Sequence, residues 1–437
     1  MRSCKISPIA LSGVVNVPGD KSISQRVALL AAIAHGESQI YGYLNGEDAL
    51  STLSAIKMIG ANVRNNNDGS LIINGTNGNF NHPENDLNLG NSGTGSRLLA
   101  GLLAGNGIEA TITGDKSLSS RPMLRIKEPL EQMGAKIELT GNKQTLPMRV
   151  SGGNLLGIDY NMPIASAQVK SCIMFASLYA NGTTKIVEPK KTRDHTEKLF
   201  ELFGIPLEIN NLAISLKGYG IKGPKINGKK IEIPGDFSSA AFWFIAAAVR
   251  PGSFVKVKNV GLNKRRTALL DVLKRMGADI KCEYKNNSYD DSGSVSVFGK
   301  KLNGTIIQGE EIPNLIDELP ILAVAAALAE GKTIIKNAEE LRVKESDRIS
   351  VIVKSLKAFG VSIEEKKDGM IISGPCKLRS PKYALNSYGD HRIAMSLAIL
   401  NTFSNDELTI NDIECVNTSY PNFWNDISKL GGIVEKL

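Results

Sequence analysis

The sequence predicts an α/β protein of two similar domains, each built from three repeated helix–strand units with buried helices. Three observations predict this fold class. One phrase occurs six times, an Ala- and Leu-rich segment also occurs six times, and the two alternate along the chain about every 70 residues. Self-similarity at a regular period is the signature of a repeated architecture. Six units of this length fit two domains of about 100–200 residues each.

The repeated phrase is an apolar residue, two variable residues, an apolar residue, glycine, two further residues and an aliphatic residue. Its six glycines lie 70 to 83 residues apart and are Gly60, Gly134, Gly204, Gly277, Gly360 and Gly431. An amphipathic helix that ends at a left-handed glycine and turns directly into a strand has this pattern. Each copy therefore predicts a surface helix followed by a strand.

The Ala- and Leu-rich segments occupy residues 27–36, 97–107, 171–182, 240–252, 321–331 and 393–405. Because they are apolar on nearly every side, we predict that they are buried helices. A membrane-spanning helix needs about 20 apolar residues, and these segments are too short for that. The predicted unit is thus a buried helix, a strand, a surface helix and a second strand.

Composition limits the classes of function. The chain has 437 residues, of which 42% are hydrophobic, so it can bury a large core. The N-terminal segment lacks the apolar stretch of a signal peptide, and nothing in it predicts export. The five cysteines show no CxxC spacing, which argues against a disulfide scaffold or zinc site and favours a reducing compartment. We expect a cytoplasmic protein without membrane association.

The net charge of +8 has two interpretations, a surface for nucleic acid or a cleft for a small, multiply anionic ligand. Aromatic residues make up only 5% of the chain, and no dense Lys/Arg run is interleaved with them. Stacking platforms for nucleic acid combine both features. A basic repeat protein that binds RNA is kept as an alternative, but the positions of the polar residues favour a small anion and no nucleic acid.

A short polar segment precedes each predicted buried helix. Helix N-termini carry unpaired N–H groups and a partial positive charge, so they bind anions. N-capping alone explains the segment of Asp236, Ser238 and Ser239. N-capping does not explain the cations and amides in and beside the other five polar segments. These segments are Asp20–Ser22, Asn91–Thr94, Ser166–Gln168, Asp317–Glu318 and Asp390–Arg392. These helix ends predict a site for phosphate and carboxylate groups.

The densest charged run is LRVKESDR at residues 341–348. On a helix, Lys344 and Arg348 would share a face at i, i+4, and Glu345 would meet Arg348 at i, i+3. A solvated surface helix is the alternative interpretation. The run lies between a strand-like segment and an apolar helix, however, and this junction favours a position that faces a ligand.

Together, eight motifs in order along essentially the whole chain resemble the 5-enolpyruvylshikimate-3-phosphate synthase family. They are PGDKSISQR at 18–26, LGNSGTGSR at 89–97, SSRPM at 119–123, ASAQVKS at 165–171, TRDHTEK at 192–198, IDELPILAVAAALAEG at 316–331, RVKESDR at 342–348 and YGDHRIAM at 388–395. The resemblance implies an enolpyruvyl transferase-type inside-out α/β barrel in each domain. It also implies one domain of residues 1–18 plus 236–437, a second of 19–235, and an active site in the cleft between them.

The resemblance implies transfer of the enolpyruvyl group of phosphoenolpyruvate to the 5-hydroxyl of shikimate 3-phosphate, with release of phosphate, in the shikimate pathway of aromatic amino-acid biosynthesis. This reaction needs a base for the hydroxyl and an acid for the methylene carbon. The family match makes Asp317 the base, Glu345 the acid and Lys21 a third catalytic residue. Because cationic side chains can stabilise the phosphate charge, we expect no metal and no cofactor. We also expect a monomer.

The same resemblance assigns the substrate contacts. Those to shikimate 3-phosphate are Lys21, Ser22, Arg26, Ser166, Ala167, Gln168, Arg193, Asp317 and Lys344. Those to phosphoenolpyruvate are Lys21, Asn91, Gly93, Arg121, Gln168, Arg348 and Arg392. The SAQVKS and TRDHTEK variants resemble the class described as glyphosate-tolerant, whose members often have Ala at the position of Gly93. Glycine there predicts room for the inhibitor.

The nearest alternative enzyme is the related family that transfers enolpyruvate to UDP-N-acetylglucosamine. Its members usually carry a cysteine a few residues before the Arg-Pro that matches Arg121-Pro122. This chain reads GDKSLSSRP at that point, and Lys21 is followed by Ser22 rather than Asn. Both differences favour shikimate 3-phosphate as the acceptor.

Overall fold

The computed structural model describes residues 2–285 and 289–437. The chain divides into two compact units, one of residues 19–233 and one of residues 1–18 with 234–437. We call them the 19–233 unit and the terminal unit. The division thus falls two residues before the position that the sequence suggested. Within the described residues, none of the helices has the length and apolar character needed to cross a membrane.

Six buried helices form the interior of the two units, as predicted. In the 19–233 unit they are α1 (Lys21–Ile33), α3 (Gly93–Asn106) and α5 (Ala167–Ser177), and in the terminal unit they are α7 (Phe237–Ala248), α9 (Leu319–Leu328) and α11 (His391–Asn401). All six begin before the apolar segments that predicted them, and in most of them the preceding polar residues contribute to the first turn. The polar segments therefore lie at the helix N-termini.

The six glycine phrases end six further helices. These are α2 (Glu47–Met58), α4 (Leu124–Gln132), α6 (His195–Leu202), α8 (Ala268–Arg275), α10 (Arg348–Ala358) and α12 (Phe423–Lys429). The glycine that follows each helix has a positive φ between 82° and 111°. Residues that have a Cβ rarely adopt this backbone conformation. The chain then turns directly into a strand, which confirms the helix–glycine–strand prediction.

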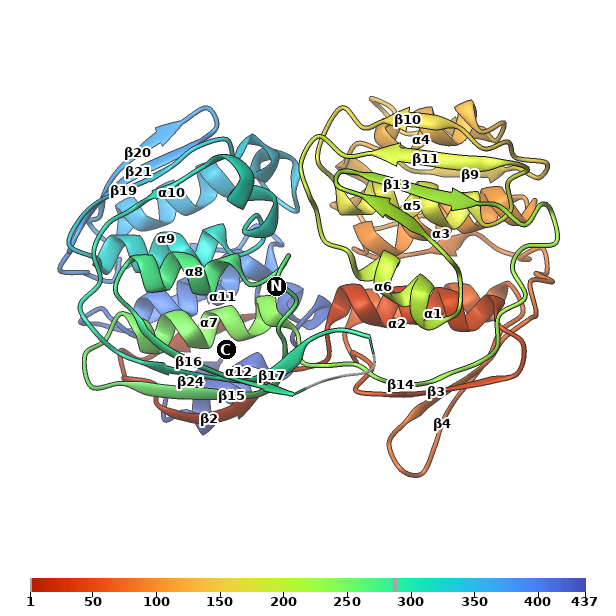
Figure 1. Cartoon of the computed structure of the whole chain (residues 1–437). Coiled ribbons are helices and arrows are strands. Elements are labelled where there is room, and N and C mark those ends of the chain that lie inside the picture. Colours follow the sequence, from red (N-terminus) through yellow and green to blue (C-terminus); the bar gives the residue numbers. More distant parts are fainter. Residues whose placement is uncertain (1, 286–288) are drawn as a thin grey trace. The chain divides into compact units, whose positions relative to one another are not determined.

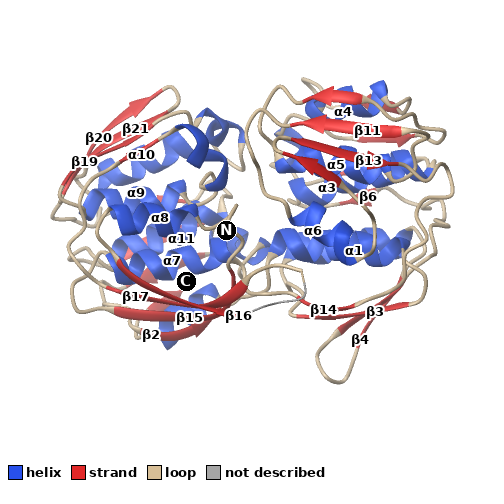
Figure 2. Cartoon of the chain, viewed as in Figure 1, coloured by secondary structure: helices blue, strands red, loops and turns tan. Residues whose placement is uncertain are grey.

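Within the residues that the structure describes, the strands form six four-stranded sheets, three in each unit. Figures 1 and 2 show their arrangement within each unit. In the 19–233 unit the sheet orders are β10 (Asp159–Asn161), β11 (Thr183–Val187), β13 (Ala213–Lys217), β12 (Glu208–Asn210); β14 (Lys230–Glu232), β3 (Glu37–Tyr41), β5 (Leu71–Asn74), β4 (Asn62–Asn65); and β6 (Leu87–Asn88), β7 (Ala110–Thr113), β9 (Met148–Ser151), β8 (Lys136–Leu139). In the terminal unit they are β16 (Asp279–Lys285), β17 (Ser292–Phe298), β15 (Phe254–Gly261), β2 (Gly13–Asn16); β18 (Ile306–Ile307), β19 (Gly331–Ile335), β21 (Gly369–Gly374), β20 (Ser362–Lys366); and β22 (Leu385–Asn386), β23 (Leu408–Asn411), β1 (Ser3–Ile6), β24 (Val434–Lys436).

Every sheet has the same plan. The strand after the buried helix pairs in parallel with a short edge strand and antiparallel with a return strand, as β11 does with β10 and β13. The strand after the glycine pairs antiparallel with that return strand on its other side, as β12 does with β13. Sequence reasoning predicted two strands per repeat and missed the other two. The missed edge strands have only two to four residues, too few for an alternating pattern.

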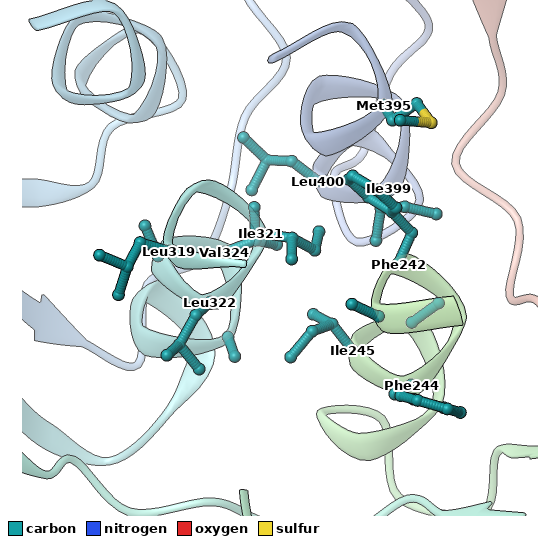
Figure 3. Packing of buried hydrophobic residues seen from close by; sticks show 14 of the residues in the cluster. Phe242, Phe244, Ile245, Leu319, Ile321, Leu322, Val324, Met395, Ile399 and Leu400 are labelled. Carbon is teal, nitrogen blue, oxygen red and sulfur yellow. The ribbon is translucent and has the colours of Figure 1, made fainter. Parts of the chain in front are cut away.

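The helices lie inside each unit and the sheets cover them from outside (Figure 2), so the predicted inside-out arrangement is confirmed. Figure 3 shows the interior of the terminal unit, where Ile245 of α7, Ile321 of α9 and Leu400 of α11 point into the space between their helices. All three side chains are fully buried. Truncating such a side chain to Ala typically costs about 2–5 kcal/mol. This packing holds the three helix N-termini of each unit in fixed positions.

Candidate active site

The N-termini of the buried helices are capped by side chains. Asp20, Ser92, Ser166, Asp236 and Asp390 each accept a hydrogen bond from a backbone N–H in the first turn of α1, α3, α5, α7 and α11. At α9 the cap position is Glu318, whose carboxylate accepts a hydrogen bond from Ser238 Oγ of α7 instead. The cap interpretation of Asp236 is confirmed, and the caps leave the neighbouring cations and amides available for other contacts.

Lys21 opens α1 and is held by an acidic residue that sequence reasoning missed. Its Nζ lies 2.9 Å from Oδ2 of Asp48, and both side chains are largely buried. Asp48 is in the first turn of α2, where an acidic residue commonly stabilises a helix through its interaction with the helix dipole. Its position in the sequence therefore did not indicate a contact with Lys21. Gln25 donates to the backbone oxygen of Asp48 at 2.8 Å and to Ser92 Oγ, which links α1 to the cap of α3.

Arg121 and Asn91 form a second group beside the start of α3. Arg121 is 6% exposed and donates to Asn91 Oδ1 at 2.6 Å, and Asn91 donates in turn to Asp115 at 2.8 Å. Gly93, the first residue of α3, has little free space. A Cβ placed there would lie 3.0 Å from the Nη1 atoms of both Arg121 and Arg97. The backbone at Gly93 thus lies directly against two guanidinium groups.

The start of α5 is joined to α3 through Gln168. Its Nε2 donates to Thr94 Oγ1 at 2.8 Å, and its Oε1 accepts a hydrogen bond from Arg97. Ser166 caps α5, and Ala167 is the first residue of that helix. Gln168 and Arg97 therefore bring the first turns of α3 and α5 together.

Arg26 connects α1 to α5 and α6. It donates to Ser171 Oγ at 2.9 Å, to Thr196 Oγ1 at 2.7 Å and to the backbone oxygen of Ser22 at 2.9 Å. Arg193 lies in the loop just before α6. Among the site residues predicted in the 19–233 unit, Lys21, Ser22, Arg26, Asn91, Gly93, Arg121, Ser166, Ala167 and Gln168 therefore lie at or beside the first turns of three neighbouring helices.

In the terminal unit, Arg348 is the centre of the predicted site. This arginine is 1% exposed. It lies 2.8 Å from Asp390 and 3.3 Å from Asp317, and it also pairs with Glu345. Burial acts to lower the pKa of Arg348, but the charges of the three carboxylates outweigh it and raise the pKa above its usual value. One guanidinium thus holds both predicted catalytic carboxylates.

The helical spacing expected for the charged run was wrong. Residues 344–347 are not helical, because η3 (Glu339–Val343) ends before Lys344 and α10 begins only at Arg348. Asp347 caps α10 and pairs with Arg342. The charged run is therefore a loop anchored at both ends rather than a helix face.

Asp317 lies against two arginines. Its carboxylate pairs with Arg348. Besides Arg348, Arg392 Nε lies 3.7 Å from Asp317 Oδ1, and Arg392 Nη1 donates to the Asp317 backbone oxygen at 3.0 Å. The cap of α9 is the next residue, Glu318, which is fully buried and lies 4.0 Å from Arg392. Arg392 is thus positioned against both residues at the start of α9.

Lys344 adds a cation to this group. Burial lowers its pKa, and the negative charges of Asp317, Glu340 and Glu345 partly oppose that effect. The terminal unit therefore combines two carboxylates suited to proton transfer with three cations, Lys344, Arg348 and Arg392. In the described parts of the chain, no group of three or more His, Cys, Asp or Glu side chains could hold a metal ion. The charge partners of these carboxylates are arginine and lysine.

The two clusters have different chemistry. The cluster of the 19–233 unit is cationic and rich in hydrogen-bond donors, which suits phosphate and hydroxyl groups. The cluster of the terminal unit places acid–base groups beside cations, which suits proton transfer next to an anionic substrate. Arg97 and Asp48 were not predicted as site residues, and Glu318 was predicted only as part of a polar helix end. All three make contacts with residues of other helices.

Comparison with known proteins identifies a family. The model of the EPSP synthase (3-phosphoshikimate 1-carboxyvinyltransferase) family matches residues 6–427. The chain is 46% identical over 431 residues to 3-phosphoshikimate 1-carboxyvinyltransferase of Akkermansia muciniphila, covering 96% of this chain and 98% of the relative. It is 44% identical over 430 residues to the enzyme of that name from Lactococcus lactis subsp. cremoris strain SK11, covering 98% of both.

Solved structures agree with this match. The EPSP synthase of Acinetobacter baumannii superimposes with a TM-score of 0.86 at 40% identity and covers 100% of both chains. The enolpyruvyl transferase NikO from Streptomyces tendae has a TM-score of 0.80 at 18% identity, which supports the fold alone. With the family model matching nearly the whole length, the chain belongs to the EPSP synthase (3-phosphoshikimate 1-carboxyvinyltransferase) family.

Proposed function

We propose that the two clusters carry out the reaction of this family on shared substrates. The protein transfers the enolpyruvyl group of phosphoenolpyruvate to the 5-hydroxyl of shikimate 3-phosphate and releases phosphate, a step of the shikimate pathway. The observation that carries the assignment of roles is the pairing of Asp317 and Glu345 with one buried guanidinium, that of Arg348. Two carboxylates fixed beside a cation provide a base and an acid next to an anionic substrate.

In the proposed mechanism, Asp317 accepts the proton of the 5-hydroxyl while the oxygen of that hydroxyl attacks C2 of phosphoenolpyruvate. Glu345 donates a proton to C3, which completes a tetrahedral intermediate. In the second step the roles reverse: Glu345 takes a proton back from the new methyl group, the double bond forms again, and the departing phosphate takes the proton held by Asp317. Lys21, held by Asp48, stabilises the charge that develops on the departing phosphate.

Substrate binding divides between cations of both units. The residues proposed to bind shikimate 3-phosphate are Lys21, Ser22, Arg26, Ser166, Ala167, Gln168, Arg193, Asp317 and Lys344. Those proposed to bind phosphoenolpyruvate are Lys21, Asn91, Gly93, Arg121, Gln168, Arg348 and Arg392. Support comes from the guanidinium groups of Arg121, Arg348 and Arg392, whose planar forks match carboxylate and phosphate oxygens.

The cellular setting is part of the same proposal. All five cysteines are thiols rather than disulfides, as is usual in a reducing compartment. We propose that the enzyme works in the cytoplasm as a monomer. Light scattering of the purified protein at micromolar concentration measures its mass, and a dimer mass would contradict the monomer.

The reaction is tested by measuring phosphate release from phosphoenolpyruvate with different acceptors. We expect turnover with shikimate 3-phosphate and none with UDP-N-acetylglucosamine. Mass spectrometry of the product should find the enolpyruvyl ether of shikimate 3-phosphate. Turnover only with the nucleotide sugar would assign the chain to the other acceptor, and turnover with neither would leave the RNA-binding alternative.

Gly93→Ala is expected to raise the inhibition constant for glyphosate far more than the Michaelis constant for phosphoenolpyruvate. The added methyl group would lie 3.0 Å from Arg121 Nη1 and Arg97 Nη1, so both guanidinium ends must shift slightly. The larger inhibitor loses more from this shift than the substrate does. Steady-state kinetics with both ligands measure the two constants, and an equal change in both would contradict a selective effect. Gly261→Ala, at the end of β15, where an added Cβ would meet only ordinary van der Waals contacts, is the control.

The lowered pKa of Lys344 predicts a pH effect. An ordinary lysine loses its proton near pH 10.5, and Lys344 should do so at lower pH because of burial. The protonated form binds the anionic substrate, so kcat/KM for shikimate 3-phosphate should decline as the pH rises through this lowered pKa. In Lys344→Arg the decline should disappear over the same range, because guanidinium stays protonated. Lys354→Arg, at an exposed lysine of α10, is the control. The same decline of kcat/KM at high pH in the parent and in both variants would contradict the prediction.

A further inference from the structure

A buried ion-pair cluster in the 19–233 unit has no part in the mechanism above. Lys170 on α5 is fully buried, and its Nζ lies 3.0 Å from Glu188 Oε2 and 2.6 Å from Glu197 Oε1. Glu188 follows β11, Glu197 lies on α6, and each is 2% exposed. Three charged side chains from three elements are thus buried together beneath the surface of the unit.

Stability alone does not account for these charges. Removing ions from water carries a large desolvation cost, and well-packed apolar residues in place of a buried ion pair are often as stable or more so. The cost is visible at Glu197, where burial raises the pKa and the nearby charge of Lys170 only partly opposes it. Unlike apolar contacts, however, charged hydrogen bonds fix the direction as well as the distance between their groups.

The cluster connects two segments that carry proposed substrate contacts. Lys170 lies two residues after Gln168, in the first turn of α5. The second oxygen of Glu188 accepts a hydrogen bond from the Thr192 backbone N–H at 3.2 Å and another from its hydroxyl. Thr192 is the residue immediately before Arg193. One lysine therefore relates the start of α5 to the loop that carries Arg193.

A second set of contacts runs beside the first on the same two helices. Ser171 and Thr196, the chain neighbours of Lys170 and Glu197, lie 2.6 Å apart, and Arg26 donates to both hydroxyls. A change in the distance between α5 and α6 would thus also displace the guanidinium of Arg26. Arg26 and Arg193, two of the cations proposed to bind shikimate 3-phosphate, therefore both depend on this helix pair.

We propose that Lys170, Glu188 and Glu197 are positioning residues for shikimate 3-phosphate. They set the distance between the Ser166–Gln168 turn and the Arg193 loop, and they act on the substrate only through these segments. The inference rests on the proposed function, because it takes shikimate 3-phosphate as the ligand of Arg26, Gln168 and Arg193. It adds three residues that touch neither substrate.

The test measures binding of shikimate 3-phosphate, without phosphoenolpyruvate, by calorimetry in the parent enzyme and its variants. Lys170→Met should weaken binding roughly 10-fold or more, since small displacements of positioning groups have effects up to about 100-fold. With saturating shikimate 3-phosphate, kcat/KM for phosphoenolpyruvate should fall less than this affinity does, because Gln168 is the one proposed phosphoenolpyruvate contact on the displaced segments. A milder variant, Thr192→Val, removes only the hydroxyl bond to Glu188 and should weaken the same binding less, which keeps the test usable if Lys170→Met does not fold.

A triple variant separates positioning from stability. Lys170→Met with Glu188→Gln and Glu197→Met removes the charges but keeps an acceptor for Thr192, so its thermal unfolding should be closer to the parent than that of Lys170→Met. Its affinity for shikimate 3-phosphate should nevertheless stay low. Recovery of affinity together with stability would overturn the proposal, as would parent-like affinity in Lys170→Met and Thr192→Val. Absence of turnover in the parent would instead refute the proposed function. Ile40→Ala, at a buried position in β3, controls for destabilisation in this unit.

Discussion

Asp317→Ala is expected to lower kcat by roughly 100-fold or more, a typical contribution of a general base. Both substrates should still bind. Arg348 keeps Asp390 and Glu345 as partners, and Arg392 still donates to the backbone oxygen of residue 317. The cations proposed to bind the substrates therefore keep their positions when the carboxylate is removed. Single-turnover kinetics at saturating substrate measure the chemical step directly.

The control for this prediction is Glu310→Ala, an exposed acidic residue of η2 (Gly309–Asn314) a few residues earlier in the chain. It removes a carboxylate of the same charge and should leave kcat unchanged. Turnover at the parent rate in Asp317→Ala would exclude this residue as the base. Equal losses in both variants would point to a general electrostatic effect of the segment.

Arg348→Met should destabilise the terminal unit by about 3–5 kcal/mol and abolish turnover, because it leaves Asp317, Glu345 and Asp390 without their shared buried cation. Both tryptophans, Trp243 and Trp424, lie in this unit, so their fluorescence during denaturant unfolding reports its stability. Turnover of the folded variant under native conditions measures the loss of activity.

Arg342→Met is the matched control, since Arg342 pairs with Asp347 and Glu365 but is partly exposed to solvent. Screening by water weakens such pairs, and we expect a smaller loss of stability than for Arg348→Met. If Arg348→Met unfolded at the same denaturant concentration as the parent, the three carboxylates would not depend on this arginine.

The repeated elements were predictable because they depend on local sequence. A helix that is apolar on all sides must be buried, and a glycine after an amphipathic helix allows the positive φ that ends it, as at Gly60 and Gly360. The short edge strands depend on pairing with a distant strand. Nothing within β6 or β18, with two residues each, predicts them.

For the site, too, local motifs were predictable from the sequence, whereas contacts between distant elements were not. Motif resemblance named Asp317, Glu345 and Arg348, but it did not predict that one arginine holds both carboxylates. Helical spacing predicted the Glu345–Arg348 contact for the wrong reason, because residue 345 lies outside α10. Asp48 and Lys170 were missed entirely, since their partners come from other elements and only the folded chain brings them together.

The central proposal is that both units act on the same phosphoenolpyruvate molecule, Arg121 from one and Arg392 from the other. The most direct measurement is calorimetric titration of phosphoenolpyruvate in the presence of saturating shikimate 3-phosphate. Arg121→Gln and Arg392→Gln should each weaken binding about 10-fold or more, the loss expected for a hydrogen bond to a charged group. Arg64→Gln and Arg379→Gln, at exposed arginines of the respective units, should bind like the parent. Parent-like affinity in either Arg121→Gln or Arg392→Gln would contradict a substrate shared by the two clusters.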